Sequence, residues 1–515
     1  MKWFLRAVCA PVVFCAALLV AQSLFAQQKA SPAKFPPPDA ISEAESPSFD
    51  EKQRRLQTFN FVWQTVKDNH FDKTFGGQNW EKIREEFSRR IAQAQSDREL
   101  HEQLQEMLNR LGKSHLAIIP PEFFRAVERA KAAGGGSATA SRIIQEEKTE
   151  PAPAENQISN GIGAEIRLLE NRIFITRVAA DSPAAKAGLK PGYLIEKING
   201  VDLQIFLEML RSEGVYTKIY EKQLSGLLST LINGGGNGQT LAIDYLDQTE
   251  RPQRVRIKPA PMPGDAVKII ADLPPQFLAF QTKSIGEEIG YVRFNLFALK
   301  TVEKFCAAVG RFKNKRALVI DLRGNAGGNF GAMFGILSLL AEREMLVGTQ
   351  IGRAGREPNF VRPQPKRFKG KIVVLTDAES HSAAEIFAAA LKENGRATIV
   401  GETTAGSALP ALSRVLPTGA VFLFPIADFS TPKGNFLEGR GVEPNIKIPL
   451  LRQTLVQGKD NQLEAALSLL KEEVKKTLPG DENVAADKND IPAAPTSIIF
   501  GAVKFGEAGI KPIAF

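Results

Sequence analysis

Residues 371–395 read KIVVLTDAESHSAAEIFAAALKENG, which places a buried strand, a short turn and a helix in succession. Ser382 stands in the turn, where the helix is expected to begin. A hydroxyl at this position lies beside the free N–H groups of the first helical turn, which can stabilise a developing oxyanion. The spacing Ser382-x-x-Glu385 equally fits a capping box, in which the serine only satisfies backbone donors. This segment alone predicts either a nucleophile or a helix cap, and the cap is the more ordinary of the two.

The residues around this segment alternate apolar, strand-like runs with helical stretches. The runs are Tyr291–Phe294, Ala317–Leu322, Lys371–Thr376 and Ile399–Val400. Such alternation is typical of an α/β domain with a mostly parallel sheet. After the second run comes a Gly-rich turn at Gly324–Asn329, whose spacing fits neither a Walker loop nor GxGxxG. Its glycines predict either a tight strand–helix connection or a backbone that aims N–H groups at a substrate carbonyl.

The whole chain of 515 residues is long enough for about three domains, which predicts a multi-domain α/β protein. Composition and periodicity divide it into a signal peptide (1–26), a Pro/Ala/Ser-rich tether (27–50), a helical region (51–130), a linker (131–157), a β-rich domain (158–260), the α/β domain (265–455), and a C-terminal helix and tail (456–515). The final helix is expected at about 461–477, because apolar residues recur there at helical spacing.

Two of these segments show regular local patterns. In the helical region, the second run of helically spaced apolar residues stops at Gly112, which we expect to cap a helix. A short strand is expected at Leu116–Ile119, directly after the KSH at 113–115. In the β-rich domain the expected strands are Arg172–Val178, Leu194–Ile198, Leu241–Tyr245 and Arg254–Ile257. Between them, Gln204–Ile232 is expected to form a helical insertion.

The composition excludes several classes of protein and site. Hydrophobic residues (43%) and charged residues (24%) stand at globular levels, so the chain is not fibrous or mainly disordered. The net charge of +9 is spread without a dense Lys/Arg block, which argues against a nucleic-acid partner. Four histidines and three cysteines are too few for a zinc ribbon, an iron–sulfur cluster or a disulfide framework. The segment HEQLQ at 101–105 begins like a metalloprotease helix motif but lacks its second histidine. We therefore expect no metal and no cofactor.

The N-terminus has the features of a secretory signal peptide. Lys2 and Arg6 form a short positive region, and an apolar stretch runs from Ala7 to about Leu24 before a small residue, Ala26, at a possible cleavage site. This pattern favours a cleaved signal over a membrane anchor. The expected location is therefore periplasmic or secreted, with membrane contact only if the segment stays uncleaved. Cleavage would leave one cysteine, which suits an exported protein without internal disulfides.

Five motifs, taken in order, resemble the C-terminal-processing (tail-specific) serine peptidase family. They are YVRFNLF (291–297), VIDLRGNAGG (319–328), LTDAESHSAAEI (375–386), RATIVGETTAG (396–406) and GRGVEPNI (439–446). Residues 161–203 are similar to the PDZ domain inserted in those enzymes, and the helical run ending in LGKSH resembles their N-terminal region. The resemblance covers most of 51–450. It implies a ClpP/crotonase-like α/β catalytic core, a PDZ domain at 158–260 and polypeptide substrates.

The resemblance is to the tricorn-like branch of this family. In the better-known branch a lysine follows the nucleophile by some 25 residues in a GKGxxQ segment, but here position 407 is Ser and the glutamine position is Ala411. The tricorn-like branch instead uses a histidine base from the N-terminal region and a glutamate before the closing GxxP segment. Carried over by position, the resemblance implies Ser382 as nucleophile, His115 as general base, Ser114 as supporting hydroxyl and Glu438 as the assisting carboxylate.

Serine catalysis requires these roles in any family, because a hydroxyl attacks poorly until a neutral imidazole takes its proton. The base must be one of four histidines, and three of them have weaker cases. His381 adjoins the nucleophile in sequence, but the side chains of neighbouring residues usually diverge. His70 and His101 lie in the helical region without a chemical companion in their local pattern. Glu443 is an alternative to Glu438 as the carboxylate. By resemblance, the oxyanion hole is formed by the N–H of Gly327 or Gly328 and the N–H of Ala383.

In the PDZ-like segment, Gly161-Ile162-Gly163-Ala164 stands where a carboxylate-binding loop is expected. Its successive N–H groups can hold a terminal carboxylate while a peptide adds as a strand; the alternative is a plain β-turn. The sequence thus predicts a serine endopeptidase that cleaves unfolded or C-terminal segments of exported proteins. The rivals are a catalytically silent PDZ scaffold and a ligand-binding protein on the same fold. The presence of Ser114, His115, Ser382 and Glu438 together favours catalysis over both.

Overall fold

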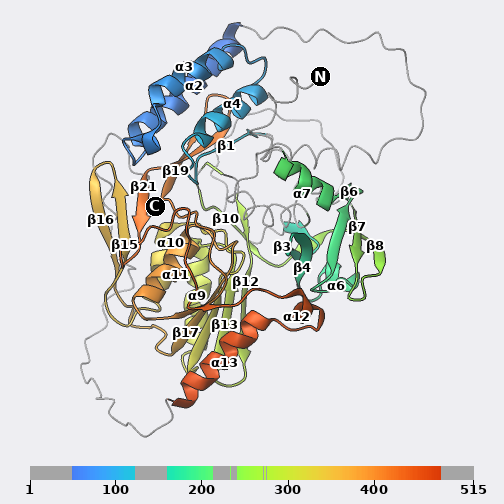
Figure 1. The fold of residues 1–515 in the computed structure, drawn as a ribbon. Helices are drawn as coiled ribbons and strands as arrows, with labels where there is room; N and C mark the ends of the chain where they lie inside the picture. The colour runs from blue at the N-terminus through green and yellow to red at the C-terminus, as the bar shows by residue number, and fades with distance from the viewer. Residues whose placement is uncertain are drawn as a thin grey trace, which may run out of the picture.

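The computed structural model describes residues 49–121, 159–212, 232, 240–270, 272–273 and 275–476 (Figure 1). The expected signal peptide, the linker at 131–157 and the tail from 479 lie outside these residues, as does most of the expected insertion at 204–232. The tether expected at 27–50 lies outside them up to residue 48, and its last two residues already belong to the first helix.

Three helices form the N-terminal region: α2 (Phe49–Asn69), α3 (Trp80–Ile91) and α4 (Asp97–Asn109), with the short 3-10 helix η2 (Phe75–Gly77) between the first two. Asn79 and Ser96 cap α3 and α4, each accepting a backbone N–H from the first turn. The indoles of Trp63 and Trp80 each donate to the other residue's carbonyl, which locks α2 against α3. The expected cap is displaced: α4 ends at Asn109, and Gly112 instead makes the turn after it with φ 59°.

This helical region shares its core with strands from the far end of the chain. Strand β1 (Ala117–Ile119) pairs with β20 (Val421–Pro425), which pairs with β19 (Ala411–Val415). Phe422 and Phe424 are buried among the residues of α2, α3 and α4. The expected boundary between a helical region and a separate α/β domain is therefore too simple, because the loop-and-hairpin segment around 411–426 packs with the N-terminal helices.

The β-rich domain is an antiparallel sheet in the order β3-β4-β5-β7-β8, with β3 at one edge. Its elements are β3 (Ala164–Leu169), β4 (Arg172–Val178), α6 (Pro183–Lys186), β5 (Leu194–Ile198), β6 (Val201–Asp202), α7 (Leu203–Ser212), β7 (Leu241–Leu246) and β8 (Pro252–Ile257). The four strands expected here are found, two of them with the expected bounds. Alternate residues of these strands point into one apolar core beneath α7.

The α/β domain is built on a six-stranded sheet in the order β12-β13-β14-β17-β18-β22, parallel except for β12 against β13. Its elements are β12 (Phe280–Ile285), β13 (Ile289–Phe294), α9 (Leu299–Arg311), β14 (Ala317–Asp321), α10 (Phe330–Ser338), β17 (Lys371–Thr376), α11 (Ala383–Glu393), β18 (Thr398–Gly401), β22 (Ile446–Lys447) and α13 (Asn461–Lys476). The mostly parallel sheet predicted from the sequence is therefore present.

Helices cover both faces of this sheet. In β14, Leu318 and Ile320 face the core formed with α9, α10 and α11, whereas Val319 faces the core formed with α13. Burial on both faces explains why β14 and β17 are continuous apolar runs rather than alternating ones. The parallel strands bring their carboxyl ends to one edge, and the turns that follow β14 and β17 meet there.

A small antiparallel sheet and short connections complete the fold. The small sheet runs β16 (Gly355–Val361), β15 (Met345–Gly352), β21 (Ala427–Ser430). The remaining elements are β2 (Ser159–Gly161), β9 (Ala260–Met262), β10 (Asp265–Val267), β11 (Gln276–Leu278) and α12 (Arg452–Val456). At the tip of the β15–β16 hairpin, the Arg353 guanidinium donates to the carbonyls of Lys67 and His70, which ties this sheet to the end of α2.

Candidate active site

Ser382 sits in the turn between β17 and α11 in a strained conformation. Its φ of 54° and ψ of −118° lie outside the regions that residues with a side chain normally occupy. The Glu385 carboxylate accepts the Ser382 N–H at 3.1 Å, which is half of a capping box. The other half is missing, because the Ser382 side chain makes no capping hydrogen bond. The Glu385 side of the capping box is thus present without a capping bond from the Ser382 hydroxyl, and Ser382 is partly exposed.

The Gly-rich turn after β14 packs directly against Ser382. A Cβ on Gly327, whose φ is 84°, would lie 2.7 Å from the Ser382 Cβ. A Cβ on Gly328 would lie 2.3 Å from the Phe297 carbonyl oxygen. Both contacts are closer than carbon atoms tolerate, so only glycine fits at these positions. The Gly327 N–H donates to the Asn325 Oδ1 at 2.8 Å, which fixes the shape of the turn.

Ser114, His115 and Glu438 form a continuous chain of hydrogen bonds. The Ser114 hydroxyl donates to the Glu438 Oε2 at 2.9 Å and lies 2.8 Å from the His115 Nδ1. The Ser114 backbone N–H donates to the Glu438 Oε1 at 2.7 Å. The hydroxyl has one proton, which it gives to the carboxylate, so its bond to the imidazole requires a proton on Nδ1. That tautomer leaves a lone pair on Nε2, the form that a general base needs.

Burial shifts the pKa of both titratable members of this chain. Desolvation lowers the pKa of His115 to about 4, so the imidazole is neutral at pH 7. Desolvation also raises the pKa of Glu438, and the hydrogen bonds from Ser114 and the Ala408 N–H oppose that rise. His115 itself has φ 58°, an uncommon conformation that turns the chain sharply between α4 and β1.

The loop between β18 and β19 joins this chain to Ser382. The Ala408 N–H donates to the Glu438 Oε2 at 3.2 Å, and the Ser382 N–H donates to the Ser407 carbonyl at 2.9 Å. Two adjacent residues of one loop thus contact the candidate nucleophile and the candidate carboxylate. Position 407, where the other branch carries a lysine, lies within the site through its backbone.

The alternative site residues lie elsewhere. Glu443 is exposed, and its carbonyl accepts a hydrogen bond from Lys392, so Glu438 is the carboxylate that contacts Ser114. His101 of α4 is bound to the hydroxyl of Thr418, which lies between β19 and β20, at 2.8 Å. His70 stacks on Phe71, and desolvation by burial lowers its pKa.

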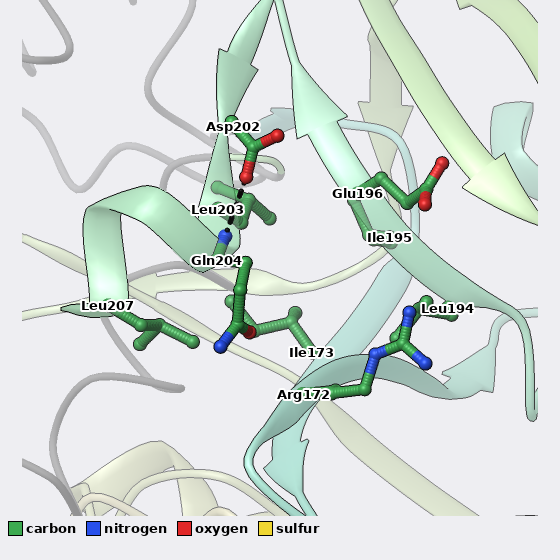
Figure 2. A pocket seen from close by; sticks show the side chains of 9 residues that line it. All are labelled: Arg172, Ile173, Leu194, Ile195, Glu196, Asp202, Leu203, Gln204 and Leu207. Carbon is green, nitrogen blue, oxygen red and sulfur yellow. Dashed lines mark hydrogen bonds between the residues drawn. The ribbon is translucent and has the colours of Figure 1, made fainter.

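In the β-rich domain, the loop Gly161-Ile162-Gly163-Ala164 leads into the edge strand β3. The Ile162 and Gly163 carbonyls accept the N–H groups of Ala184 and Ala179, each at 2.8 Å. Gly163 has φ 74°, and a Cβ there would lie 2.4 Å from the Ser182 Cβ. A pocket in the same domain lies under the first turn of α7 (Figure 2). It is lined by residues of β4, β5, β6 and α7 and by none of the four loop residues.

Sequence reasoning missed two features of the site. One is the Glu385 carboxylate, which binds two backbone donors, Gly406 and Ser407, in addition to Ser382. The other is Asn325, whose side chain holds the Gly-rich turn. Both lie in motifs used for the resemblance, but their partners are set by long-range packing.

Within the described part of the chain, no cluster of His, Cys, Asp and Glu could hold a metal ion. No helix of that part is long and apolar enough to cross a membrane.

Comparison with known proteins relates this geometry to a family. Residues 288–448 match the model of peptidase family S41, residues 51–109 that of the tricorn protease C1 domain, and residues 174–210 that of a PDZ domain. A carboxyl-terminal-processing protease of Synechocystis is 25% identical, covering 87% of this chain and 92% of the relative. One from Picosynechococcus is 26% identical, covering 82% and 89%.

Two solved structures share the fold. The photosystem II D1 C-terminal processing protease has 20% identity and a TM-score of 0.51, covering 81% of this chain and 97% of that one. Mature CPAF has 15% identity and a TM-score of 0.52, covering 82% and 97%. The matching family models and the relatives favour a catalytic peptidase over a silent scaffold or a carrier. The chain is therefore a serine peptidase with a PDZ domain, similar to the carboxyl-terminal-processing proteases and, over residues 288–448, to peptidase family S41.

Proposed function

We propose that this protein is an endopeptidase in which Ser382 attacks the peptide bond and Glu438, Ser114 and His115 activate it. The observation that carries the proposal is the unbroken chain from the Glu438 carboxylate through the Ser114 hydroxyl to the His115 ring. It supports a base with a defined tautomer, since the protonated Nδ1 is bound and Nε2 carries the lone pair.

The reaction proceeds in two halves. The His115 Nε2 takes the Ser382 hydroxyl proton as the serine oxygen bonds to the substrate carbonyl carbon. The same nitrogen then returns the proton to the leaving amine, the C–N bond breaks, and an acyl-enzyme remains. A water molecule attacks the ester with His115 again as base, and Ser382 leaves with its proton restored. The carboxylate of Glu438, acting through Ser114, stabilises the imidazolium that forms in each half.

The oxyanion is bound by the N–H groups of Gly328 and Ala383. The resemblance left Gly327 or Gly328 open as the first donor. The Gly327 N–H is already bonded to Asn325, which favours Gly328. Ala383 is the first residue of α11, so its N–H also benefits from the positive end of the helix. A donor of this kind typically contributes about 10²–10³ in rate.

The substrates are polypeptides, cut in unfolded or C-terminal segments, and the names of the relatives support the C-terminal part of this proposal. The PDZ domain recognises them through the loop at 161–164 and the adjoining strand. Support comes from the position of β3 at the sheet edge, where an extended peptide can add as a strand. The N-terminal 26 residues direct export, so the enzyme acts in the periplasm or outside the cell, with membrane contact only if that segment is retained.

Active-site labelling with a fluorophosphonate probe tests the proposal. Wild type is expected to be labelled, Ser382→Ala to be unlabelled, and His115→Ala to be labelled at a strongly reduced rate. Equal labelling of wild type and Ser382→Ala would refute Ser382 as the nucleophile. Full peptidase activity of His115→Ala would refute the base while leaving the nucleophile in place.

A further inference from the structure

The Glu385 carboxylate lies completely buried in the first turn of α11 and accepts four hydrogen bonds. The Thr404 hydroxyl and the Gly406 N–H bind its Oε1, each at 2.6 Å. The Ser407 N–H and the Ser382 N–H bind its Oε2, at 2.8 and 3.1 Å. An ionised carboxylate accepts but cannot donate, and it has about four lone-pair positions. The donors therefore saturate the ionised form.

These contacts fix the conformation of the nucleophile. A residue with a side chain stays at φ 54° and ψ −118° only where its surroundings hold it there. The Ser382 N–H is held from two sides, by the Ser407 carbonyl at 2.9 Å and by the Glu385 carboxylate. Because the same carboxylate also binds the Ser407 N–H, it fixes the loop that supplies the carbonyl as well.

The fixed loop reaches the other half of the site. The Ala408 N–H, next to Ser407, donates to the Glu438 Oε2 at 3.2 Å. One carboxylate thus sets the position of the Ser382 backbone relative to the group that orients Ser114 and His115. A glutamine at 385 would keep one acceptor oxygen, and its NH₂ group would face donors.

We propose that Glu385, in its ionised form, is a positioning residue that holds Ser382 in its strained turn and in register with the Glu438–Ser114–His115 chain. This inference rests on Ser382 being the nucleophile, as proposed above. Displacement of a reacting atom by about 1 Å can cost 10²-fold in rate, so loss of this support should lower the catalytic constant far more than substrate binding.

The environment of the carboxyl gives the proposal a second readout. Burial raises the pKa of Glu385 to about 7, against the opposing hydrogen bonds from Thr404, Gly406, Ser407 and Ser382. No charged side chain is among the causes of this shift. The titratable groups joined to it through the loop are Glu438 and, beyond Ser114, His115. A carboxyl protonated below about pH 7 can no longer accept all four bonds, so activity should fall as the pH drops through that range.

The test compares Glu385→Gln with the matched control Glu402→Gln in the full chain. Glu402 is the first residue of the same loop, and its Oε1 accepts the Leu450 N–H at 2.9 Å, whereas no hydrogen bond joins its side chain to Ser382. We expect Glu385→Gln to lower kcat and the rate of fluorophosphonate labelling about 10²-fold, with KM changed only a few-fold. In the pH dependence of its rate, the acidic limb should move from about pH 7 toward the pKa of His115, about 4. Glu402→Gln should retain the wild-type rate and pH profile.

The outcomes separate this proposal from the assignment of Ser382. Wild-type labelling of Glu385→Gln, when Ser382→Ala is unlabelled, would overturn the role of Glu385 alone. A reduced rate with an unchanged acidic limb would overturn the requirement for the ionised form. If Glu385→Gln fails to fold, Glu385→Asp carries the test, since it keeps a carboxylate on a shorter arm. We expect Glu385→Asp to retain part of the rate, with the acidic limb of its pH–rate profile shifted to lower pH. An acidic limb at the wild-type pH would refute the proposal.

Discussion

At the scale of single residues, the Ser114 side chain connects two titratable groups, the Glu438 carboxylate and the His115 imidazole. Its hydroxyl bridges Glu438 and His115, and its backbone N–H holds the second carboxylate oxygen. Only a group that both donates and accepts can stand between a carboxylate and a protonated Nδ1, and a serine hydroxyl does both. The side chain is 5% exposed, so water does not readily take its place.

Replacing Ser114 by alanine should therefore separate the carboxylate from the base. We expect kcat to fall by about 10²–10⁴-fold, the range that a positioned general base contributes, with little change in KM. The control is Ser413→Ala, which removes another buried hydroxyl, bound to Asp272 at 2.6 Å outside the site. Steady-state kinetics on an unfolded peptide substrate measure both. Equal activities for the two variants would show that Ser114 plays no part in the relay.

At the scale of elements, the two turns that follow β14 and β17 form a single packing unit. The first turn carries Gly327 and Gly328, the second carries Ser382, and the parallel pairing of the two strands brings them together. The PDZ strand β3 also reaches this edge, where Arg167 pairs with Asp377 in the second turn and Glu165 pairs with Arg293 at 2.7 Å. The turn that carries Ser382 is thus packed against the core on one side and contacted by the PDZ domain through Asp377.

A methyl group on Gly327 should push these turns apart. Gly327→Ala combines a contact of 2.7 Å to the Ser382 Cβ with a φ of 84°. Overpacking of this kind costs about 1–3 kcal/mol, and the strain falls on the nucleophile. Gly395→Ala is the matched control: its φ is 71°, but a Cβ there meets nothing within 4 Å. We expect both variants to lose some stability and only Gly327→Ala to lose labelling by a fluorophosphonate. Comparable labelling of the two would contradict the close packing.

At the scale of the whole molecule, the site is shared between regions far apart in the sequence. The N-terminal helices bring Ser114 and His115, and the α/β domain brings Ser382 and Glu438. What joins them physically is the mixed core in which Phe422 and Phe424 of β20 are buried against α2, α3 and α4. Strand β1 extends the same connection, since Ile118 lies opposite Phe422 in the ladder.

Loosening that mixed core should reduce activity before the protein unfolds. Phe422→Ala removes a fully buried ring, which typically costs about 3–5 kcal/mol. Phe174→Ala, in the PDZ domain, removes a ring of equal size with 2% exposure and serves as the control. Well below the melting temperature of both variants, we expect slower fluorophosphonate labelling for Phe422→Ala and wild-type labelling for Phe174→Ala. The same rate in both would mean that the mixed core does not control the site.

The sequence predicted those parts of the molecule that depend on local pattern. Strand β17 and the PDZ strands β4 and β5 were predicted with their bounds, because short apolar runs between turn signals determine them. The pairing of β1 with β20 was not, because a ladder between residues 117–119 and 421–423 leaves no local trace. The contact of Glu438 with Ser114 was implied only by resemblance. The fourfold bonding of Glu385 was missed, since its partners in the loop at 404–407 depend on how that loop folds back.

The distance along the chain between Ser114 and Glu438, 324 residues, has a consequence for biosynthesis. A growing polypeptide carries Ser114 and His115 early but receives Ser382, and later Glu438, only when most of it has been made. The strand that seats the N-terminal helices, β20, is also among the late segments. An incomplete chain in the producing cell therefore lacks part of the proposed hydrolytic centre.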